Sequence, residues 1–281
     1  MRVFKLKKDL QQHLQQLRAA GKSIGLVPTM GALHQGHLSL IAQARQNADI
    51  VISTIFVNPT QFTDPKDLEK YPRPIEQDMQ KLEQAGCDIL FNPEVAEMYA
   101  GNEQWHLNIG ELEFLLEGEF RPGHYQGVTQ VVFKLFDIVK PDIALFGQKD
   151  YQQVMVISKM VEILKLPVKL LMCPILRDED GLAMSSRNIH LSATERQQAL
   201  ILSKALFWIK DHFNRDNISK LQEQAAAIIG QQDGVELEYL QITDGDTLHP
   251  ANQNSNKIVA LVAARVGKTR LIDNVLLVHG S

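Results

Sequence analysis

The sequence predicts an α/β protein: a large domain built on a parallel sheet with helices on both faces, then a smaller C-terminal α+β domain. Short β-rich runs alternate with helical patterns through the first two-thirds of the chain, which is typical of repeated strand–helix–strand units. The run at 49–59 is a continuous Val/Ile stretch, as expected for a strand buried on both faces. Beyond about residue 180 the alternation stops, and two helical patterns precede three strand-like runs.

The large domain is expected to contain five strands and four helices in alternation. The strands are predicted at 22–30, 49–59, 87–93, 142–147 and 167–175. The helices are predicted at 37–48, 75–86, 127–139 and 150–166. In the first helix, Leu38, Ile41 and Ala42 are expected on one face, and Gly86 is expected to end the second. This order of elements predicts a Rossmann-like sheet.

The C-terminal part is expected to fold as a separate unit. Ser192 and Glu195 have the spacing of a capping box at the start of a long helix. The helices are predicted at 192–213 and 218–230, and the strands at 235–244, 256–266 and 270–279. The charged, Gly-containing RDEDG segment marks the boundary, so the domains are predicted at 1–176 and 177–281.

Composition excludes several classes of protein. The formal net charge of −4 supplies no general basic field for nucleic acid or anionic membranes. No run approaches 18 apolar residues, and the N-terminus lacks the apolar core of a signal peptide. Cys87 and Cys173 each lie in an apolar stretch, which indicates buried thiols in a reducing compartment. We therefore expect a cytoplasmic protein without nucleic-acid or membrane partners.

Two sequences resemble phosphate-binding P-loops but lack a required glycine. Gly21-Lys22-Ser23 and Gly267-Lys268-Thr269 resemble the end of a P-loop, but the glycine required five residues earlier is replaced by Gln16 and Val262. The chain also lacks the GxGxxG fingerprint of dinucleotide binding.

The segment 30–37, MGALHQGH, has the pattern of a phosphate-binding turn. It follows the first predicted strand and opens the first helix, where backbone N–H groups and the helix dipole favour an anion. His34 and His37 are three residues apart and could donate hydrogen bonds to a leaving pyrophosphate. The alternative is that one histidine caps the helix and the other is a surface residue. Because both occur in HxGH directly after a strand, phosphate binding is favoured over that alternative and over a metal site.

The segment 184–188, MSSRN, follows the last strand of the large domain. Hydroxyl groups and a guanidinium on a loop suit a lid that closes over a polyphosphate. HxGH and a KMSKS-like loop together mark the nucleotidyl-transferase superfamily, although the leading lysine of KMSKS is absent here. Lys149, in GQKD at a strand's carboxyl end, is the candidate for the missing cation.

Five blocks of the sequence, in order, resemble the pantothenate synthetase (pantoate–β-alanine ligase) family. They are MGALHQGH (30–37), FVNPTQF (56–62), RPGHYQGV (121–128), FGQKDYQQ (146–153) and MSSRN (184–188). The resemblance implies an ATP- and Mg²⁺-dependent ligase that joins (R)-pantoate to β-alanine through a pantoyl adenylate, releasing pyrophosphate and AMP. It also implies a homodimer.

The resemblance also assigns residues to roles. It implies His37 as a proton donor, His34 on the phosphates, and Lys149 and Arg187 as the cations beside the reacting phosphate. Gln61 and Gln153 are implied to bind pantoate, and Gln61 to lie near β-alanine. The implied ATP-binding residues are Met30, Gly31, Ala32, Leu33, His34, Gln35, Gly36, His37, Gly147, Gln148, Lys149, Asp150, Leu176, Met184, Ser185, Ser186 and Arg187.

Secondary candidates stay open. Asn58, Met30 and Pro28 line the same region in the family. Arg121 and His124 could guard the site, or Arg121 could pair with a nearby glutamate.

Three other functions are alternatives. A nucleotidyl-transferase of the same superfamily would need no amine. A regulatory ATP sensor would have little need for four histidine and cationic groups at the phosphates. A relative of the aminoacyl-tRNA synthetases would need a basic RNA-binding surface.

Overall fold

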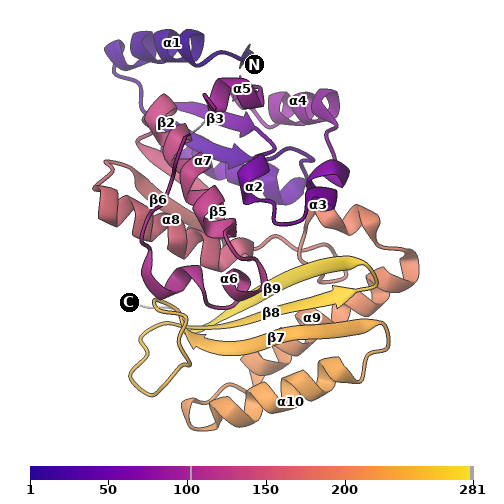
Figure 1. The fold of residues 1–281 in the computed structure, drawn as a ribbon. Helices are drawn as coiled ribbons and strands as arrows, with labels where there is room; N and C mark the ends of the chain where they lie inside the picture. The colour runs from indigo at the N-terminus through magenta and orange to yellow at the C-terminus, as the bar shows by residue number, and fades with distance from the viewer. Residues whose placement is uncertain (102, 279–281) are drawn as a thin grey trace. The chain divides into compact units, whose positions relative to one another are not determined.

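The computed structural model describes residues 1–101 and 103–278, which form two compact units (Figure 1). Unit 1 comprises Met1–Gly147 and Gln152–Pro174, and unit 2 comprises Gln148–Tyr151 and the chain from Ile175 onward. The domain division at 176/177 stays a prediction, and the two units differ from it chiefly because Gln148–Tyr151 groups with the second. Among the described residues, no helix is long and apolar enough to cross a membrane.

Unit 1 is built on a parallel sheet of six strands in the described part of the chain, in the order β1-β4-β3-β2-β5-β6. The strands are β1 (Arg2–Phe4), β2 (Ile24–Thr29), β3 (Ile50–Ile55), β4 (Ile89–Phe91), β5 (Ile143–Gly147) and β6 (Lys169–Cys173). The predicted parallel sheet is confirmed, and β1, which was not predicted, forms its edge beside β4.

Helices connect the strands of unit 1. The longer helices are α1 (Lys7–Ala19), α2 (Gln35–Asn47), α4 (Ile75–Gln84), α7 (His124–Val139) and α8 (Tyr151–Leu164). Shorter helices lie between them: η1 (Pro59–Gln61), α3 (Pro65–Lys70), α5 (Val95–Met98), η2 (Gly110–Glu113) and α6 (Glu117–Phe120). The short η3 (Gln148–Asp150) belongs to unit 2. The predicted face of α2 was partly wrong, because Leu40, Ile41 and Ala44 are its buried residues and Ala42 is exposed.

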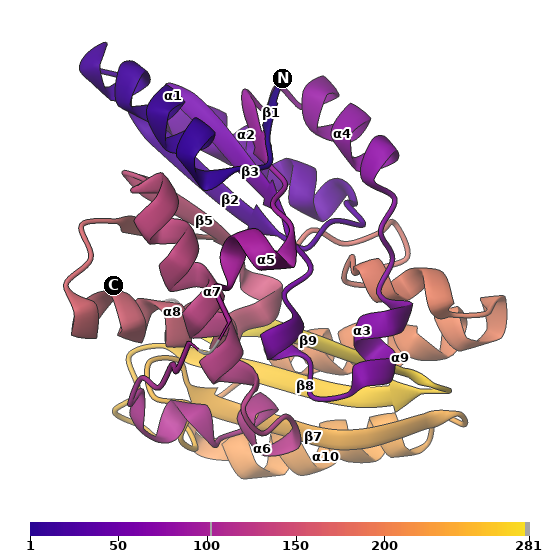
Figure 2. The ribbon, with the colours of Figure 1, turned by 45° about the horizontal axis from the view of Figure 1, so that its top comes forward.

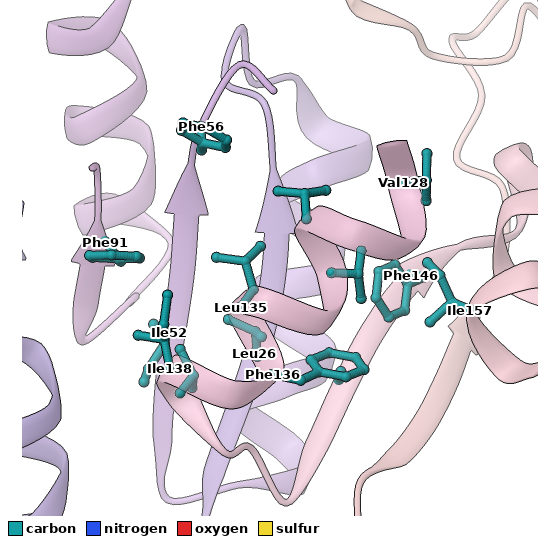
Figure 3. Close-up of a cluster of buried hydrophobic side chains, with 14 of the residues drawn as sticks. Leu26, Ile52, Phe56, Phe91, Val128, Leu135, Phe136, Ile138, Phe146 and Ile157 are labelled. Atoms are coloured by element: carbon teal, nitrogen blue, oxygen red, sulfur yellow. The ribbon is translucent and has the colours of Figure 1, made fainter. Parts of the chain in front are cut away.

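The strands bury both faces because successive side chains point to opposite sides of a sheet. Leu26, Ile52 and Phe146 belong to a core with residues of α1, α7 and α8, and Figure 3 shows α7 directing Leu135 and Phe136 into it. The adjacent residues of the same strands form the second core, with α2 and α4. They include Val27, Val51 and Leu145. Helices on both faces, as predicted, are therefore confirmed.

The centre of the sheet opens at its carboxyl end. The backbone groups of Ile24 point towards β5, where they bond to Asp142. Since the bonding direction alternates along a strand, the backbone groups of Leu26 and Pro28 point the same way. Proline has no N–H to donate, and the pairing of β2 with β5 ends at Leu26. Since β3 and β5 lie on either side of β2, this is where the strand order reverses, the usual ligand position in open α/β sheets.

Unit 2 is an antiparallel sheet with two helices, which confirms the predicted α+β class. The strands are β7 (Val235–Asp244), β8 (Ile258–Val266) and β9 (Thr269–Val278), and the helices are α9 (Ala193–Asp211) and α10 (Ile218–Gly230). Two short turns, η4 (Ser186–His190) and η5 (Arg215–Asn217), complete it. Helix α9 packs on β8 and β9, and α10 on β7 (Figure 2).

The capping box predicted at α9 is present. The Ser192 hydroxyl accepts a hydrogen bond from the Glu195 N–H at 3.2 Å, and the Glu195 carboxylate accepts one from the Ser192 N–H at 2.8 Å. The predicted last strand ended at 279, which lies outside the described residues.

Candidate active site

Two predicted segments of unit 1 follow neighbouring strands at the opened end of the sheet. MGALHQGH follows β2 and FVNPTQF follows β3, and the two strands run in parallel register from Ile24↔Ile50 to Thr29↔Ile55. The segments are in contact, because the Gln61 Nε2 donates to the Met30 sulfur at 3.3 Å.

His34 and His37 cap the amino end of α2. The Nδ1 of His34 accepts a hydrogen bond from the Gly36 N–H at 3.1 Å, and the Nδ1 of His37 accepts one from the His34 N–H at 3.3 Å. Both rings therefore take part in capping the helix, whereas the alternative had one histidine at the cap and the other at the surface. A ring nitrogen that accepts carries no proton, so each neutral imidazole carries its proton on Nε2. The two rings lie together at the helix amino terminus, with their centroids 4.0 Å apart.

The loop before these histidines is held by α4. The buried carboxylate of Asp78 accepts hydrogen bonds from the N–H groups of Ala32 at 2.7 Å and Leu33 at 2.8 Å. One turn further on, the Lys81 ammonium donates to the Leu33 carbonyl at 2.7 Å. The loop needs this support because Ala32, which is not a glycine, has a positive φ of 50°.

Gln61 has a defined amide orientation. Its Oε1 accepts a hydrogen bond from the Asn58 Nδ2 at 3.1 Å, and Asn58 is in turn held by the Tyr99 hydroxyl, which donates to its Oδ1 at 2.6 Å. Because the Gln61 oxygen is occupied, the amide presents Nε2–H donors, which suit a carboxylate or hydroxyl acceptor.

The amino end of α7 supports the backbone of Gln61. The Nδ1–H of His124 donates to the Gln61 carbonyl at 2.8 Å, which leaves Nε2 to accept from Arg121 at 3.2 Å. Gly127 lies so close to η1 that an added Cβ would meet the Thr60 carbonyl oxygen at a clashing distance. The RPGHYQG segment therefore packs against the backbone of Gln61, the predicted pantoate-binding residue.

The two neighbouring glutamines at the start of α8 differ. Gln152 is buried, and its amide accepts from the Glu117 N–H at 3.1 Å and donates to the carbonyls of Leu112 and Leu115 at 3.0 and 2.7 Å. Gln153, the predicted pantoate-binding residue, is half-buried.

In unit 2, strand β9 holds the predicted GQKD segment. The Asn274 Nδ2 donates to the carbonyls of Gln148 at 2.9 Å and Lys149 at 3.0 Å, and its Oδ1 accepts from the Gln148 Nε2 at 3.0 Å. The Lys149 side chain is 18% exposed, and its ammonium lies 3.7 Å from the Asp150 carboxylate.

The predicted residues Leu176 and Met184 lie opposite each other in a short hairpin. The Met184 N–H donates to the Leu176 carbonyl at 3.1 Å, and Arg177 and Ala183 form an antiparallel bridge. The Leu176 side chain is exposed while its backbone is engaged. Next along the chain, the Ser185 hydroxyl accepts from the Arg187 N–H at 3.2 Å and begins η4.

The hairpin is tied to β9 beside the GQKD contact. The Arg177 guanidinium donates to both oxygens of Asp273, at 2.6 and 2.9 Å, and stacks on Phe207 of α9. Burial raises the pKa of the Asp273 carboxyl, although the hydrogen bonds from Arg177 act in the opposite direction. Asp273 and Asn274 thus hold the two predicted ATP-binding segments of unit 2.

Within the described residues, no group of three or more His, Cys, Asp or Glu side chains could hold a metal ion. The described residues therefore suit Mg²⁺ only in its usual binding mode. In that mode most ligands are substrate phosphates and water, and the protein supplies one or two carboxylates.

The structure brings the predicted residues into two sets. Residues 30–37 and Gln61 lie together in unit 1, which also contains Gly147 and Gln153. Gln148–Asp150, Leu176 and 184–187 belong to unit 2. Sequence reasoning missed Asp78, Lys81, Asp273 and Asn274. A signal existed for the last two, because Asp-Asn interrupts an otherwise apolar strand, LIDNVLLV.

Comparison with known proteins identifies relatives over nearly the whole chain. The family model described as pantoate-beta-alanine ligase matches residues 2–276. The chain is 46% identical over 266 residues to the pantothenate synthetase of Desulfitobacterium hafniense, covering 94% of each chain.

Two solved structures are similar over nearly the full length. The pantothenate synthetase of Thermus thermophilus has a TM-score of 0.93 and 38% identity, covering 99% of this chain and 100% of that one. The pantoate-beta-alanine ligase of Francisella tularensis, complexed with beta-gamma ATP and beta-alanine, has a TM-score of 0.82 and 37% identity, covering 99% and 98%.

Proposed function

The chain belongs to the pantoate–β-alanine ligase family, and from that premise we propose that it condenses (R)-pantoate with β-alanine at the expense of ATP. In the first step, a pantoate carboxylate oxygen attacks the α-phosphorus of ATP. The bond to the β-phosphate oxygen breaks, which gives pantoyl adenylate and pyrophosphate. In the second step, the β-alanine amine attacks the acyl carbon, loses a proton and displaces AMP.

The side-by-side histidines of α2 are the observation that carries this proposal. Two Nε2–H donors at a helix amino terminus suit the negative charge that develops on a departing pyrophosphate. We assign His34 to the phosphates and His37 to proton donation. The loop 30–36 would supply the remaining backbone contacts to ATP.

Cations complete the proposed phosphate contacts. Lys149 and Arg187 would stabilise the charge of the pentacoordinate phosphorus. The remaining proposed ATP contacts are Gly147, Gln148, Asp150, Leu176, Met184, Ser185 and Ser186. Neither histidine nor cation needs to form a covalent bond, because a carboxylate and an amine are competent nucleophiles once aligned.

Gln61 is proposed to bind pantoate through its Nε2–H donors, since Asn58 occupies its oxygen. A neutral amide orients a carboxylate without forming the ion pair that would reduce its nucleophilicity. Gln153 would bind the same substrate, and Gln61 would also lie near β-alanine.

Mg²⁺ is proposed to enter with ATP. It would neutralise phosphate charge and make pyrophosphate a better leaving group. Among the proposed ATP contacts, Asp150 is the residue with a carboxylate that could bind the ion, and it lies 3.7 Å from the Lys149 ammonium. The homodimer, the cytoplasmic location and the role of unit 2 as a lid over ATP stay predictions.

The deciding experiment measures pyrophosphate release with ATP, Mg²⁺ and (R)-pantoate, with and without β-alanine. Sustained turnover that needs both substrates, with AMP and pantothenate as products, is expected. Steady release without the amine would instead indicate a nucleotidyl-transferase, and no release in any combination would refute pantoate as the acid.

Single-turnover kinetics test the histidine assignment. His37→Ala should slow adenylate formation far more than it weakens pantoate binding, by about 10²- to 10⁴-fold for a general acid. His37→Asn is the matched variant, because its Oδ1 can still accept the His34 N–H while the Nε2–H is lost. It should fold as the wild type and be equally slow, and normal adenylate formation in either variant would remove His37 from this role.

A further inference from the structure

We infer that Asn274 is a positioning residue for Lys149, because its side-chain amide sets the turn from which the lysine projects. This inference rests on the proposed role of Lys149 at the phosphates. It adds a residue more than a hundred positions further along the chain to the machinery of the first step.

The amide of Asn274 is almost fully used on this one turn. Its two N–H groups are donated to the carbonyls of Gln148 and Lys149, and its oxygen accepts from the Gln148 side chain. A primary amide has two donors and one oxygen, so this pattern fixes its orientation. Rotating the amide by half a turn would set oxygen against two carbonyls and nitrogen against a donor.

The burial of Asn274 shows that these bonds are required. The side chain is 1% exposed, in a strand that is otherwise mostly Leu, Ile and Val apart from the adjacent Asp273. A buried amide is costly unless it is hydrogen-bonded, and an apolar residue would satisfy packing alone. Its polar groups are directed at η3, the turn that carries Lys149.

The neighbouring residue immobilises Asn274. Asp273 is paired with Val262 and Asn274 with Leu261, so the two side chains point to opposite faces of the sheet. Asp273 accepts the Asn274 N–H at 2.7 Å, and Arg177 donates to the Asn274 carbonyl at 3.3 Å. The Arg177–Asp273 ion pair therefore holds the backbone of Asn274 in place, and this fixes the position of its side-chain amide.

A second contact keeps the turn attached when Asn274 is replaced. The Tyr151 hydroxyl donates to the Gly245 carbonyl at 2.7 Å, at the other end of the segment. Without the Asn274 amide, the segment Gln148–Tyr151 should therefore stay attached through Tyr151, while the Lys149 side chain loses its fixed orientation.

A double-mutant cycle in the full chain tests the inference. Asn274→Ala, Lys149→Ala and the double variant are compared by single-turnover adenylate formation. We expect Asn274→Ala to be about 10- to 100-fold slower, as for a displaced catalytic group, with pantoate binding unchanged. The double variant should be no slower than Lys149→Ala, because residues that act as one unit are not additive.

Controls separate positioning from general stability. Asn252→Ala removes another side-chain to backbone hydrogen bond, from the Asn254 N–H at 2.8 Å, in an exposed loop of the same unit. It should react at the wild-type rate. If Asn274→Ala does not fold, Asn274→Leu, which keeps a similar buried volume but has no donors, is used in the same cycle.

The outcomes are distinct. Additive losses in the double variant, or a wild-type rate for the folded Asn274 variant, would overturn the positioning role and leave the proposed function intact. A wild-type rate for Lys149→Ala would remove the proposed role of Lys149 and the inference with it.

Discussion

The Asp78 carboxylate accepts the backbone N–H of Ala32 at 2.7 Å, across 46 positions of sequence. This contact stabilises a left-handed residue that is not glycine, in the loop that delivers the two histidines. A side chain at the adjacent Gly31 would be strained, since its φ is 82° and a Cβ would lie 3.0 Å from both the Asp78 oxygen and Ile55.

Replacing Asp78 with Asn should reduce both stability and activity. One oxygen can still accept, but the amide NH₂ then faces the second backbone N–H. We expect a loss of about 1.5–3 kcal/mol in the free energy of unfolding, the range for hydrogen bonds to charged groups. The rate of adenylate formation should fall by up to about 10²-fold through displacement of the histidines.

Urea unfolding and single-turnover kinetics measure the two effects. Glu76→Gln, on the exposed side of the same helix, is the matched control. It should leave the rate unchanged and lower stability by at most about 0.3–1 kcal/mol, the contribution of a carboxylate in a helix's first turn. A wild-type adenylation rate in Asp78→Asn would show that the loop keeps its position without the carboxylate.

Replacing Gly127 with Ala should disturb Gln61. The new Cβ would meet the backbone of η1 at a clashing distance and would lie 2.7 Å from the Gln61 Cα. Such overpacking typically costs about 1–3 kcal/mol, and the KM for pantoate should rise more than that for ATP.

Gly230→Ala is the control for this substitution. It places the same methyl group at the end of α10 with nothing within 4 Å, so it should be neutral or slightly stabilising. Steady-state kinetics with each substrate varied in turn provide the readout, and an unchanged pantoate KM in Gly127→Ala would argue against the role of Gln61.

The two cysteines should be inert in the native protein. Burial raises the pKa of the Cys87 thiol to about 11 and raises that of Cys173 as well. Only a thiolate reacts readily, so a thiol reagent at pH 8 should modify neither residue until denaturant is added. Rapid labelling of the native enzyme would contradict this expectation.

The same shift implies a dependence of stability on pH. The folded protein holds the Cys87 proton more tightly than the unfolded chain, whose value is 9.0. The contribution of Cys87 is therefore fully present below about pH 9 and is lost as the pH rises towards 11. Cys87→Ala should show a weaker decline over this range in urea-unfolding experiments.

Replacing Ser192 with Ala should destabilise α9. The substitution removes the acceptor for the Glu195 N–H and typically costs about 1 kcal/mol, whereas Ser192→Gly costs only a few tenths. Denaturant unfolding distinguishes the two variants, and equal stability of the Ala variant and the wild type would show that the cap adds nothing.

The sequence predicted those features that depend on local pattern. The continuous Val/Ile run located β3, short β-rich runs located β2 and β5, and the Ser192–Glu195 spacing located the start of α9. The face of α2 was partly mispredicted because the helix contacts the sheet through Leu40, Ile41 and Ala44, and sheet packing determines which stripe is buried. The edge strand β1 has only three residues, too few for a periodicity to be recognised.

The supports of the candidate site could not be predicted because they come from distant parts of the chain. Asp78 lies in a helix with ordinary charged composition, and only tertiary contact shows which carboxylate faces the loop. Asn274 was detectable in principle, since two adjacent polar residues in an apolar strand are unusual. Its partners, the carbonyls of residues 148 and 149, leave no trace in the sequence.

The path of the backbone also has a consequence for engineering. The chain passes from unit 1 to unit 2 after Gly147, returns after Tyr151 and leaves again after Pro174. A truncation at 174 would leave the Tyr151 hydroxyl and the carbonyls of Gln148 and Lys149 without their acceptor and donor. The second unit therefore cannot be separated by a single cut in the chain. Exchanging it between homologues would require exchanging the segment Gln148–Tyr151 as well.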